Sequence, residues 1–324
     1  MEAIKVVVIL LIGFVLLIKG ADFFVEGASS IAKILKVPAI IIGLTVVAMG
    51  TSLPELAVSV TASISNNNAL AVSNVVGSNL FNLMVVLGAS ALMNPIIVGK
   101  DTIKKDYPFS VLCAILLLVL GFIGMELGRV DGVILLVIFI GFIVYQVLSA
   151  LKARKNQSNL EVEMEEEVEE IKELPFWLSL IYVIGGAVAI KFGGDFVVNS
   201  AVAIAAALGM SQTLIGLTIV ALGTSLPELA TSVVAAKKGE LDMAVGNVVG
   251  SNVFNILMIL GVAASLSEIT FLHENIIDIA ILLVFSLITW LLCWTKGKLE
   301  KKEGFLMIAL YVAYVVYICV RALA

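Results

Sequence analysis

The sequence contains the same two motifs twice, at a constant separation. Gly50–Leu56 reads GTSLPEL, and Gly223–Leu229 repeats it letter for letter. Gly77–Asn82 reads GSNLFN and returns as GSNVFN at Gly250–Asn255. Both pairs are 173 positions apart, so the two halves align here without a gap. We infer an internal duplication, which predicts a fold built from two similar halves.

The composition is typical of a polytopic membrane protein. Of the 324 residues, 61% are hydrophobic and 14% are charged, whereas soluble domains carry about 25% charged residues. Apolar runs of about twenty residues recur, each long enough to cross the hydrocarbon core of a bilayer. We predict an all-α integral membrane protein with ten spans, at about 4–30, 38–64, 69–94, 106–125, 130–151, 175–207, 212–236, 241–266, 275–295 and 304–322. The first is expected to be retained rather than cleaved as a signal peptide, because it lacks a small-residue cleavage pattern.

The distribution of basic residues predicts the orientation. Fifteen lysines and arginines lie in one set of loops, while the opposite set and the termini hold three, Lys5, Arg129 and Arg321. Under the positive-inside rule, the first set is cytoplasmic. Both termini are therefore expected outside the cell, in a multi-pass protein of the cell membrane.

An odd number of spans in each half predicts that the halves are inverted. Residues 1–155 form the first five-span repeat and 175–324 the second, which must enter the membrane from the opposite side. The connecting segment, 156–174, contains eight glutamates. We interpret it as a solvated cytoplasmic linker; a Ca2+-sensing role is the alternative, although no EF-hand spacing supports it.

The second span contains a carboxylate beside an expected helix break. Pro54 has no N–H and crowds the carbonyl of Gly50, so carbonyls from Ala48 to Thr51 are predicted to lose helical partners. Spacings of four and three residues place Thr51 and Ser52 on the helix face of Glu55. The seventh span repeats the pattern with Ala221, Thr224, Ser225, Pro227 and Glu228.

The third and eighth spans add hydroxyls and amides. Ser78 lies four residues before Asn82, and Ser251 four before Asn255, while Gly77 and Gly250 should let these helices approach the broken ones. Every candidate ligand is an oxygen, which suits hard cations such as Ca2+ and Na+. A single hydroxyl or amide could serve only helix packing, but an ionised glutamate near mid-membrane costs about 3 kcal/mol or more. Two glutamates in matching positions therefore favour an ion site at the repeat interface.

These paired motifs resemble the two alpha-repeats of the sodium/calcium exchanger family, prokaryotic type, within the cation/calcium exchanger superfamily. The resemblance covers essentially the whole chain. It implies Ca2+ export against about three Na+ by alternating access, with the first and sixth spans sliding across the other eight. Small residues at Gly20-Ala21 and Gly193-Gly194 would then permit sliding against that core.

The resemblance also implies roles for individual residues. Glu55 and Glu228 would be the central ligands, with the carbonyls of Thr51 and Thr224 completing the Ca2+ site. Flanking Na+ sites would use the carbonyls of Ala48 and Ala221 with Thr51, Ser52, Ser78, Thr224, Ser225 and Ser251. Asn82 and Asn255 would line the middle. An acid at the position of Asn255 is linked to K+ transport in the potassium-dependent branch, so the asparagine implies K+-independent exchange.

The charges expected in the pocket are consistent with exchange of Ca2+ for Na+, but they leave an alternative function open. A pocket with two ionised glutamates is neutralised by one Ca2+, whereas three Na+ would leave one positive charge and make the cycle electrogenic. Two like charges in an empty pocket favour protonation, so protons should compete with Ca2+. A Ca2+/H+ exchanger is the alternative function, and a cation channel is a more distant one.

Other functional classes find no support in the sequence. We expect no enzyme activity and no cofactor, since no HExxH, GxSxG or Walker sequence is present and the single histidine is His273. Nothing basic and aromatic indicates a nucleic-acid partner. The expected partners are Ca2+ and Na+ as substrates, protons as competitors and the lipid bilayer. One copy of the chain should suffice for transport, and the sequence leaves the oligomeric state open.

Overall fold

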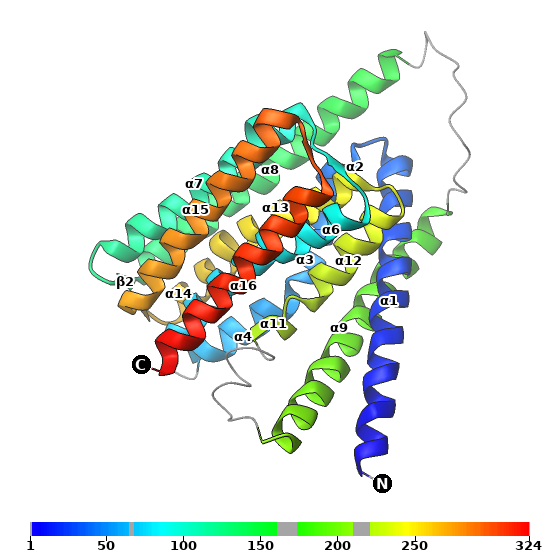
Figure 1. Ribbon diagram of the computed structural model, residues 1–324. Coiled ribbons are helices and arrows are strands. Elements are labelled where there is room, and N and C mark those ends of the chain that lie inside the picture. Colours follow the sequence, from blue (N-terminus) through cyan, green and yellow to red (C-terminus); the bar gives the residue numbers. More distant parts are fainter. Residues whose placement is uncertain (1, 65–67, 161–173, 210–220, 324) are drawn as a thin grey trace.

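The structure, a computed structural model, describes residues 2–64, 68–160, 174–209 and 221–323 and is almost entirely helical (Figure 1). Within these residues, eight helices are long and apolar enough to cross a membrane, and a bent pair, Ala39–Thr51 with Leu53–Ile64, makes up to nine. The all-α membrane fold expected from the composition is therefore confirmed. Residues 212–220 of the seventh expected span, 212–236, lie outside the described residues, as does most of the acidic linker.

The elements of the two halves follow the same order. The first half contains α1 (Glu2–Leu35), α2 (Ala39–Ile42), η1 (Gly43–Val47), α3 (Ala48–Thr51), α4 (Leu53–Ile64), α5 (Asn68–Phe81), η2 (Asn82–Val86), α6 (Leu87–Met93), β1 (Ile96–Ile97), η3 (Thr102–Asp106), α7 (Tyr107–Phe122), β2 (Glu126–Leu127) and α8 (Arg129–Leu160). The second contains α9 (Phe176–Ala207), α11 (Ala221–Gly223), α12 (Leu226–Lys237), α13 (Leu241–Phe254), η5 (Asn255–Ile259), α14 (Leu260–Leu266), β3 (Ile269–Thr270), α15 (His273–Lys296), β4 (Lys298–Leu299) and α16 (Lys301–Leu323). Elements named η are π-helical turns.

The first helices of the two halves run antiparallel along one another (Figure 1). A Cβ at Gly13 would meet Gly193 O, one at Gly20 would meet Gly186 O, and one at Gly27 would meet Ser179 O. Residue numbers therefore rise along α1 as they fall along α9. Because these helices are equivalent members of the repeat, their opposite directions mean that the halves have inverted topology.

Five glycines of α1 and α9 face the partner helix: Gly13, Gly20, Gly27, Gly186 and Gly193. The Cβ of an alanine at Gly20 would lie 2.8 Å from Ile190 N, and one at Gly193 would lie 2.5 Å from Leu17 N. Sliding against the core stays a prediction for Ala21, which lies in a buried cluster with residues of α12 and α13. Gly20 and Gly193, by contrast, contact the opposite long helix. Their lack of a side chain instead lets the two backbones touch, which joins α1 and α9 into one unit.

This contact predicts a position-specific loss of stability. In Gly186→Ala, the new methyl group would lie 2.7 Å from both Gly20 O and Phe24 N, which are backbone atoms that cannot move aside. Such overpacking costs about 1–3 kcal/mol. Thermal unfolding in detergent should show a midpoint several degrees lower, while Gly185→Ala, on the exposed neighbouring face with nothing within 4 Å, should not. Equal midpoints for the two variants would contradict this packing.

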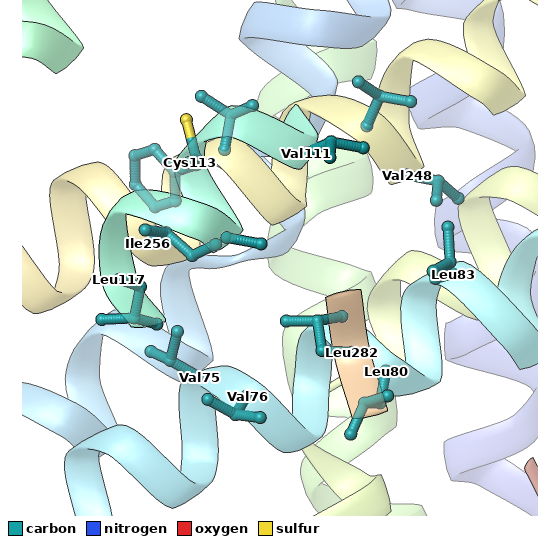
Figure 2. Close-up of a cluster of buried hydrophobic side chains, with 14 of the residues drawn as sticks. Val75, Val76, Leu80, Leu83, Val111, Cys113, Leu117, Val248, Ile256 and Leu282 are labelled. Carbon is teal, nitrogen blue, oxygen red and sulfur yellow. The ribbon is translucent and has the colours of Figure 1, made fainter. Parts of the chain in front are cut away.

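Two helices occupy the centre of the bundle. In the most apolar part of the α5–α6 and α13–α14 spans, 78% and 83% of residues are buried, against 22–39% in the other spans. Val75, Leu80 and Val248 from these helices belong to one buried cluster with Leu117 of α7 and Leu282 of α15 (Figure 2). The GSN motifs therefore lie inside the protein, where polar side chains are shielded from lipid.

Two short antiparallel ribbons connect the halves at the ends of the bundle. β1 pairs with β4, matching Ile96 with Leu299, and β2 pairs with β3, matching Leu127 with Ile269. Each ribbon joins one strand from each repeat. The repeats are therefore tied together by backbone hydrogen bonds as well as by the buried core.

Candidate functional site

Each copy of the GTSLPEL motif contains a break in a helix. The chain bends by 49° between Ala39–Thr51 and Leu53–Ile64. Ser52 at this break has φ −86° and ψ 11°, and Ser225 at the matching position has φ −93° and ψ 8°. Pro54 and Pro227 follow two residues later, where the missing N–H and the ring prevent a continuous helix. Glu55 and Glu228 consequently lie in the first turn of α4 and of α12.

One expectation about the break was wrong. The carbonyl of Ala48 keeps a helical partner, since Ser52 N donates to it at 3.1 Å. In the second repeat Ser225 N donates to Leu222 O at 3.3 Å, so the turn before that break is tighter. The carbonyl of Ala48 is therefore less available to bind an ion than Pro54 alone suggested, because the helix ends only after Thr51.

The serine hydroxyls cross between the two repeats. Ser52 Oγ donates to Glu228 Oε1 at 2.7 Å, and Ser225 Oγ donates to Glu55 Oε1 at 3.0 Å. From their spacing in the sequence, each serine hydroxyl was expected beside the glutamate of its own helix. In the structure, each one instead bonds the glutamate of the other repeat. Ser78 Oγ of α5 also donates to Glu55 Oε1, at 3.4 Å. Each carboxylate therefore accepts a hydrogen bond from the other repeat, which places both at the interface of the repeats.

Each glutamate is fully buried and keeps one oxygen without a donor. Glu55 and Glu228 are both 0% exposed. Glu55 Oε2 and Glu228 Oε2 have no hydrogen-bond partner among the described residues. The salt bridges found in that part of the chain involve neither carboxylate. Because an uncompensated buried carboxylate is costly, this arrangement favours a positive ion from solution.

The asparagines meet on the axis between the repeats. Asn79 Nδ2 donates to Asn252 O at 3.1 Å, and Asn252 Nδ2 donates to Asn79 O at 3.3 Å, as expected for residues related by a two-fold rotation. Asn255 Nδ2 donates to Asn79 Oδ1 at 3.0 Å, and Asn255 Oδ1 has no donor among the described residues. Both amide atoms of Asn82 also lack a partner among the described residues. Since π-helical turns η2 and η5 begin at Asn82 and Asn255, both asparagines mark local distortions of the kind common at functional sites.

The other predicted site residues lie around this centre. Thr51 Oγ1 is within hydrogen-bond distance of Val47 O and Ala48 O, at 3.1 and 3.3 Å, and Ser251 Oγ is 3.5 Å from Ala48 O. Thr224 Oγ1 is buried without a partner in the described part of the chain. Of Ala221, only the backbone is described. The expected close approach at Gly250 is confirmed, because a Cβ added there would lie 2.6 Å from Leu44 O. At Gly77 no described atom lies within 4 Å of an added Cβ, so the approach expected there stays a prediction.

An apolar cleft of about 130 Å³ reaches the first break from the direction of α1 and α9. It is lined by Phe24, Gly50, Thr51, Leu53, Pro54, Ala187, Val188, Ile190, Lys191 and Pro227. The lining thus combines both prolines with the helices that form the α1–α9 unit.

The sequence analysis missed two polar residues beside the site. Asn74 and Asn247 lie four residues before Ser78 and Ser251, and both donate hydrogen bonds toward the glutamate-bearing helices. A signal was present, since the repeat extends upstream as NVVGSN in both halves.

Comparison with known proteins identifies the chain's relatives. The family described as "Sodium/calcium exchanger protein" matches residues 5–148 and 178–320, two stretches that begin 173 positions apart. Sodium/calcium exchanger MaX1 of Methanosarcina acetivorans is 33% identical over 95% of this chain and 97% of its own length. Inner membrane protein YrbG of Escherichia coli is 36% identical over 89% of each chain.

A solved structure has the same fold. The sodium-calcium exchanger NCX_Mj, soaked with 2.5 mM Na+ and 10 mM Sr2+, superposes with a TM-score of 0.82 at 34% identity, covering 97% of this chain and 99% of that one. The family is one of transporters rather than enzymes. The repeated motifs, the buried carboxylates and these matches together place the chain in the sodium/calcium exchanger family.

Proposed function

We propose that the protein is an antiporter that exchanges Ca2+ for Na+ across the cell membrane, with about three Na+ for each Ca2+ and net movement of charge. The observation that carries this proposal is the pair of fully buried glutamates, each with one oxygen lacking a donor among the described residues. The names of MaX1 and NCX_Mj, both sodium/calcium exchangers, support it.

In this proposal, Glu55 and Glu228 bind the ions directly. At about 4 Å and an effective dielectric of about 20, each pair of unit charges contributes about 4 kcal/mol, enough to favour a divalent ion between two carboxylates. The remaining ligands are the oxygens of Thr51, Thr224, Ser52, Ser225, Ser78, Ser251, Asn82 and Asn255, with the carbonyls of Ala48 and Ala221. The carbonyl of Ala48 is the weakest candidate, because Ser52 N already donates to it.

Independence from K+ is proposed from the contact of Asn255. Its Nδ2 acts as a donor to Asn79 Oδ1 at 3.0 Å. An aspartate at this position would replace the donor with a carboxylate oxygen facing another oxygen, and would add a third negative charge. The asparagine instead keeps the pocket at about −2, a charge that one Ca2+ neutralises.

Alternating access is proposed to use the α1–α9 unit. Because its two helices touch through glycine backbones, they should move together over the breaks at Ser52 and Ser225. We place both termini outside the cell on the basis of the basic residues in the loops. Protons are proposed as competitors of Ca2+ at the two carboxylates.

Flux in proteoliposomes tests the proposal. Vesicles containing the purified protein and loaded with Na+ should accumulate radioactive Ca2+ when diluted into Na+-free buffer, with or without K+. A membrane potential that is positive inside should speed this uptake, because three Na+ leaving for each Ca2+ that enters carry one net positive charge outward. Uptake that ignores the Na+ gradient but follows an imposed pH gradient would instead identify a Ca2+/H+ exchanger.

A further inference from the structure

Two buried or half-buried amides hold the helices that carry the site glutamates. Asn74 Nδ2 of α5 donates to Ser59 Oγ at 3.1 Å and lies 3.4 Å from Glu55 O. Asn247 Nδ2 of α13 donates to Ser232 Oγ at 2.8 Å and lies 3.5 Å from Glu228 O. The contacts are the same in both repeats, so the duplication has kept a pattern that the ion ligands alone do not include.

The position of these contacts matters because each glutamate follows a break. α4 begins at Leu53 and α12 at Leu226, so each glutamate lies in a first turn that no preceding turn supports. In each repeat the asparagine Nδ2 lies within hydrogen-bond distance of the main-chain oxygen of the glutamate and of the serine hydroxyl one turn later. Both bonds fix this turn against the central helix that also carries Ser78 or Ser251. The direction of the carboxylate then follows from a backbone that is held in place.

Asn247 makes one contact more than its counterpart. Thr51 Oγ1 lies 3.1 Å from Asn247 Oδ1, which links α13 to the end of α3 in the other repeat. The corresponding hydroxyl, Thr224 Oγ1, has no hydrogen-bond partner among the described residues. Asn247 is also fully buried, whereas Asn74 is half-buried. Loss of the Asn247 side chain should therefore disturb both breaks, and loss of Asn74 only one.

We propose that Asn74 and Asn247 are positioning residues of the ion site, which set the orientation of Glu55 and Glu228 through Ser59, Ser232 and the glutamate carbonyls. This inference rests on the proposed function, because it assumes that the glutamates bind Ca2+. Neither asparagine is assigned a contact with the ion. Asn247 is expected to have the larger effect.

The experiment compares Ca2+ affinity and transport in the full-length chain. Asn247→Ala should raise the apparent KM for Ca2+ in Na+-driven uptake, and the Kd for Ca2+ in detergent, by roughly tenfold, as expected for lost buried hydrogen bonds. Asn74→Ala should raise both by roughly threefold. Asn199→Ala, which removes an exposed amide from α9, is the matched control and should change neither.

A double-mutant cycle distinguishes positioning from a general loss of stability. Because Asn247 acts through Ser232, Ser232→Ala added to Asn247→Ala should change Kd by less than about twofold, although Ser232→Ala alone raises it severalfold. Additive effects, or an unchanged Kd beside a lower melting temperature, would overturn the proposal. Wild-type protein that binds Ca2+ without Na+-coupled uptake would count against the proposed exchange alone, since the Kd comparison would still report on the asparagines.

Discussion

Glu55→Gln and Glu228→Gln should each lower Na+-driven Ca2+ uptake by at least about a hundredfold. Glutamine keeps the size of the side chain and an oxygen that can accept the hydrogen bond from Ser225 or Ser52. It removes one negative charge, however, and with it a term of about 4 kcal/mol between carboxylate and cation, where about 1.4 kcal/mol is a factor of ten. Initial rates of radioactive Ca2+ uptake in proteoliposomes provide the measurement.

The fold of these variants should survive. Removing a buried carboxylate that lacks a cationic partner among the described residues also removes its desolvation cost, so the melting temperature in detergent should be unchanged or higher. Glu274→Gln, at an exposed carboxylate in the first turn of α15, is the control and should transport normally. Normal uptake by either central variant would show that the glutamates do not bind the transported ion.

Gly250→Val should abolish transport through packing rather than through charge. A Cβ at this position would lie 2.6 Å from Leu44 O and 2.7 Å from Leu44 Cα, and both are main-chain atoms. The valine must therefore push α13 away from η1, which precedes the break at Ser52. Overpacking of this kind costs about 1–3 kcal/mol, and the same displacement would separate Ser251 from Ala48.

A smaller side chain at position 250 should cause a smaller loss of transport. Gly250→Ala adds only the Cβ and should retain partial transport with a raised KM for Ca2+, whereas Gly141→Val on the exposed face of α8 should behave as wild type. Melting temperature and uptake should fall together across the Gly250 series. Full activity in Gly250→Val would mean that α13 does not approach η1 as closely as the structure indicates.

The membrane class and the paired site were accessible from the sequence for specific reasons. An apolar run long enough to span a bilayer is expected to form a helix, because a helix hydrogen-bonds its backbone N–H and C=O groups internally. Glu55 and Glu228 stood out because an acid in an apolar stretch is expensive, and the constant offset of 173 residues connected them. The proline rule located both breaks, at Ser52 and Ser225, to within two residues.

Contacts between the repeats could not be deduced in the same way. Spacing along one helix placed Ser52 beside Glu55, whereas the structure directs its hydroxyl to Glu228. The small residues Gly20-Ala21 and Gly193-Gly194 suggested a surface that slides against the core, but the backbones at Gly20 and Gly193 contact the opposite long helix. In each case the partner belongs to a segment far away in the chain, and local periodicity carries no information about it.

Two similar halves that cross a membrane, each with an acid in an apolar stretch next to a helix break, can be read directly from the order of residues, because burial and broken helices follow from local chemistry. The hydrogen bond that each acid accepts from a serine of the opposite half, and the contacts of Asn74 and Asn247 with the turns that carry the acids, are visible only in the folded protein. The partner of a polar atom depends on how inverted repeats pack, which is settled only when the whole bundle has assembled.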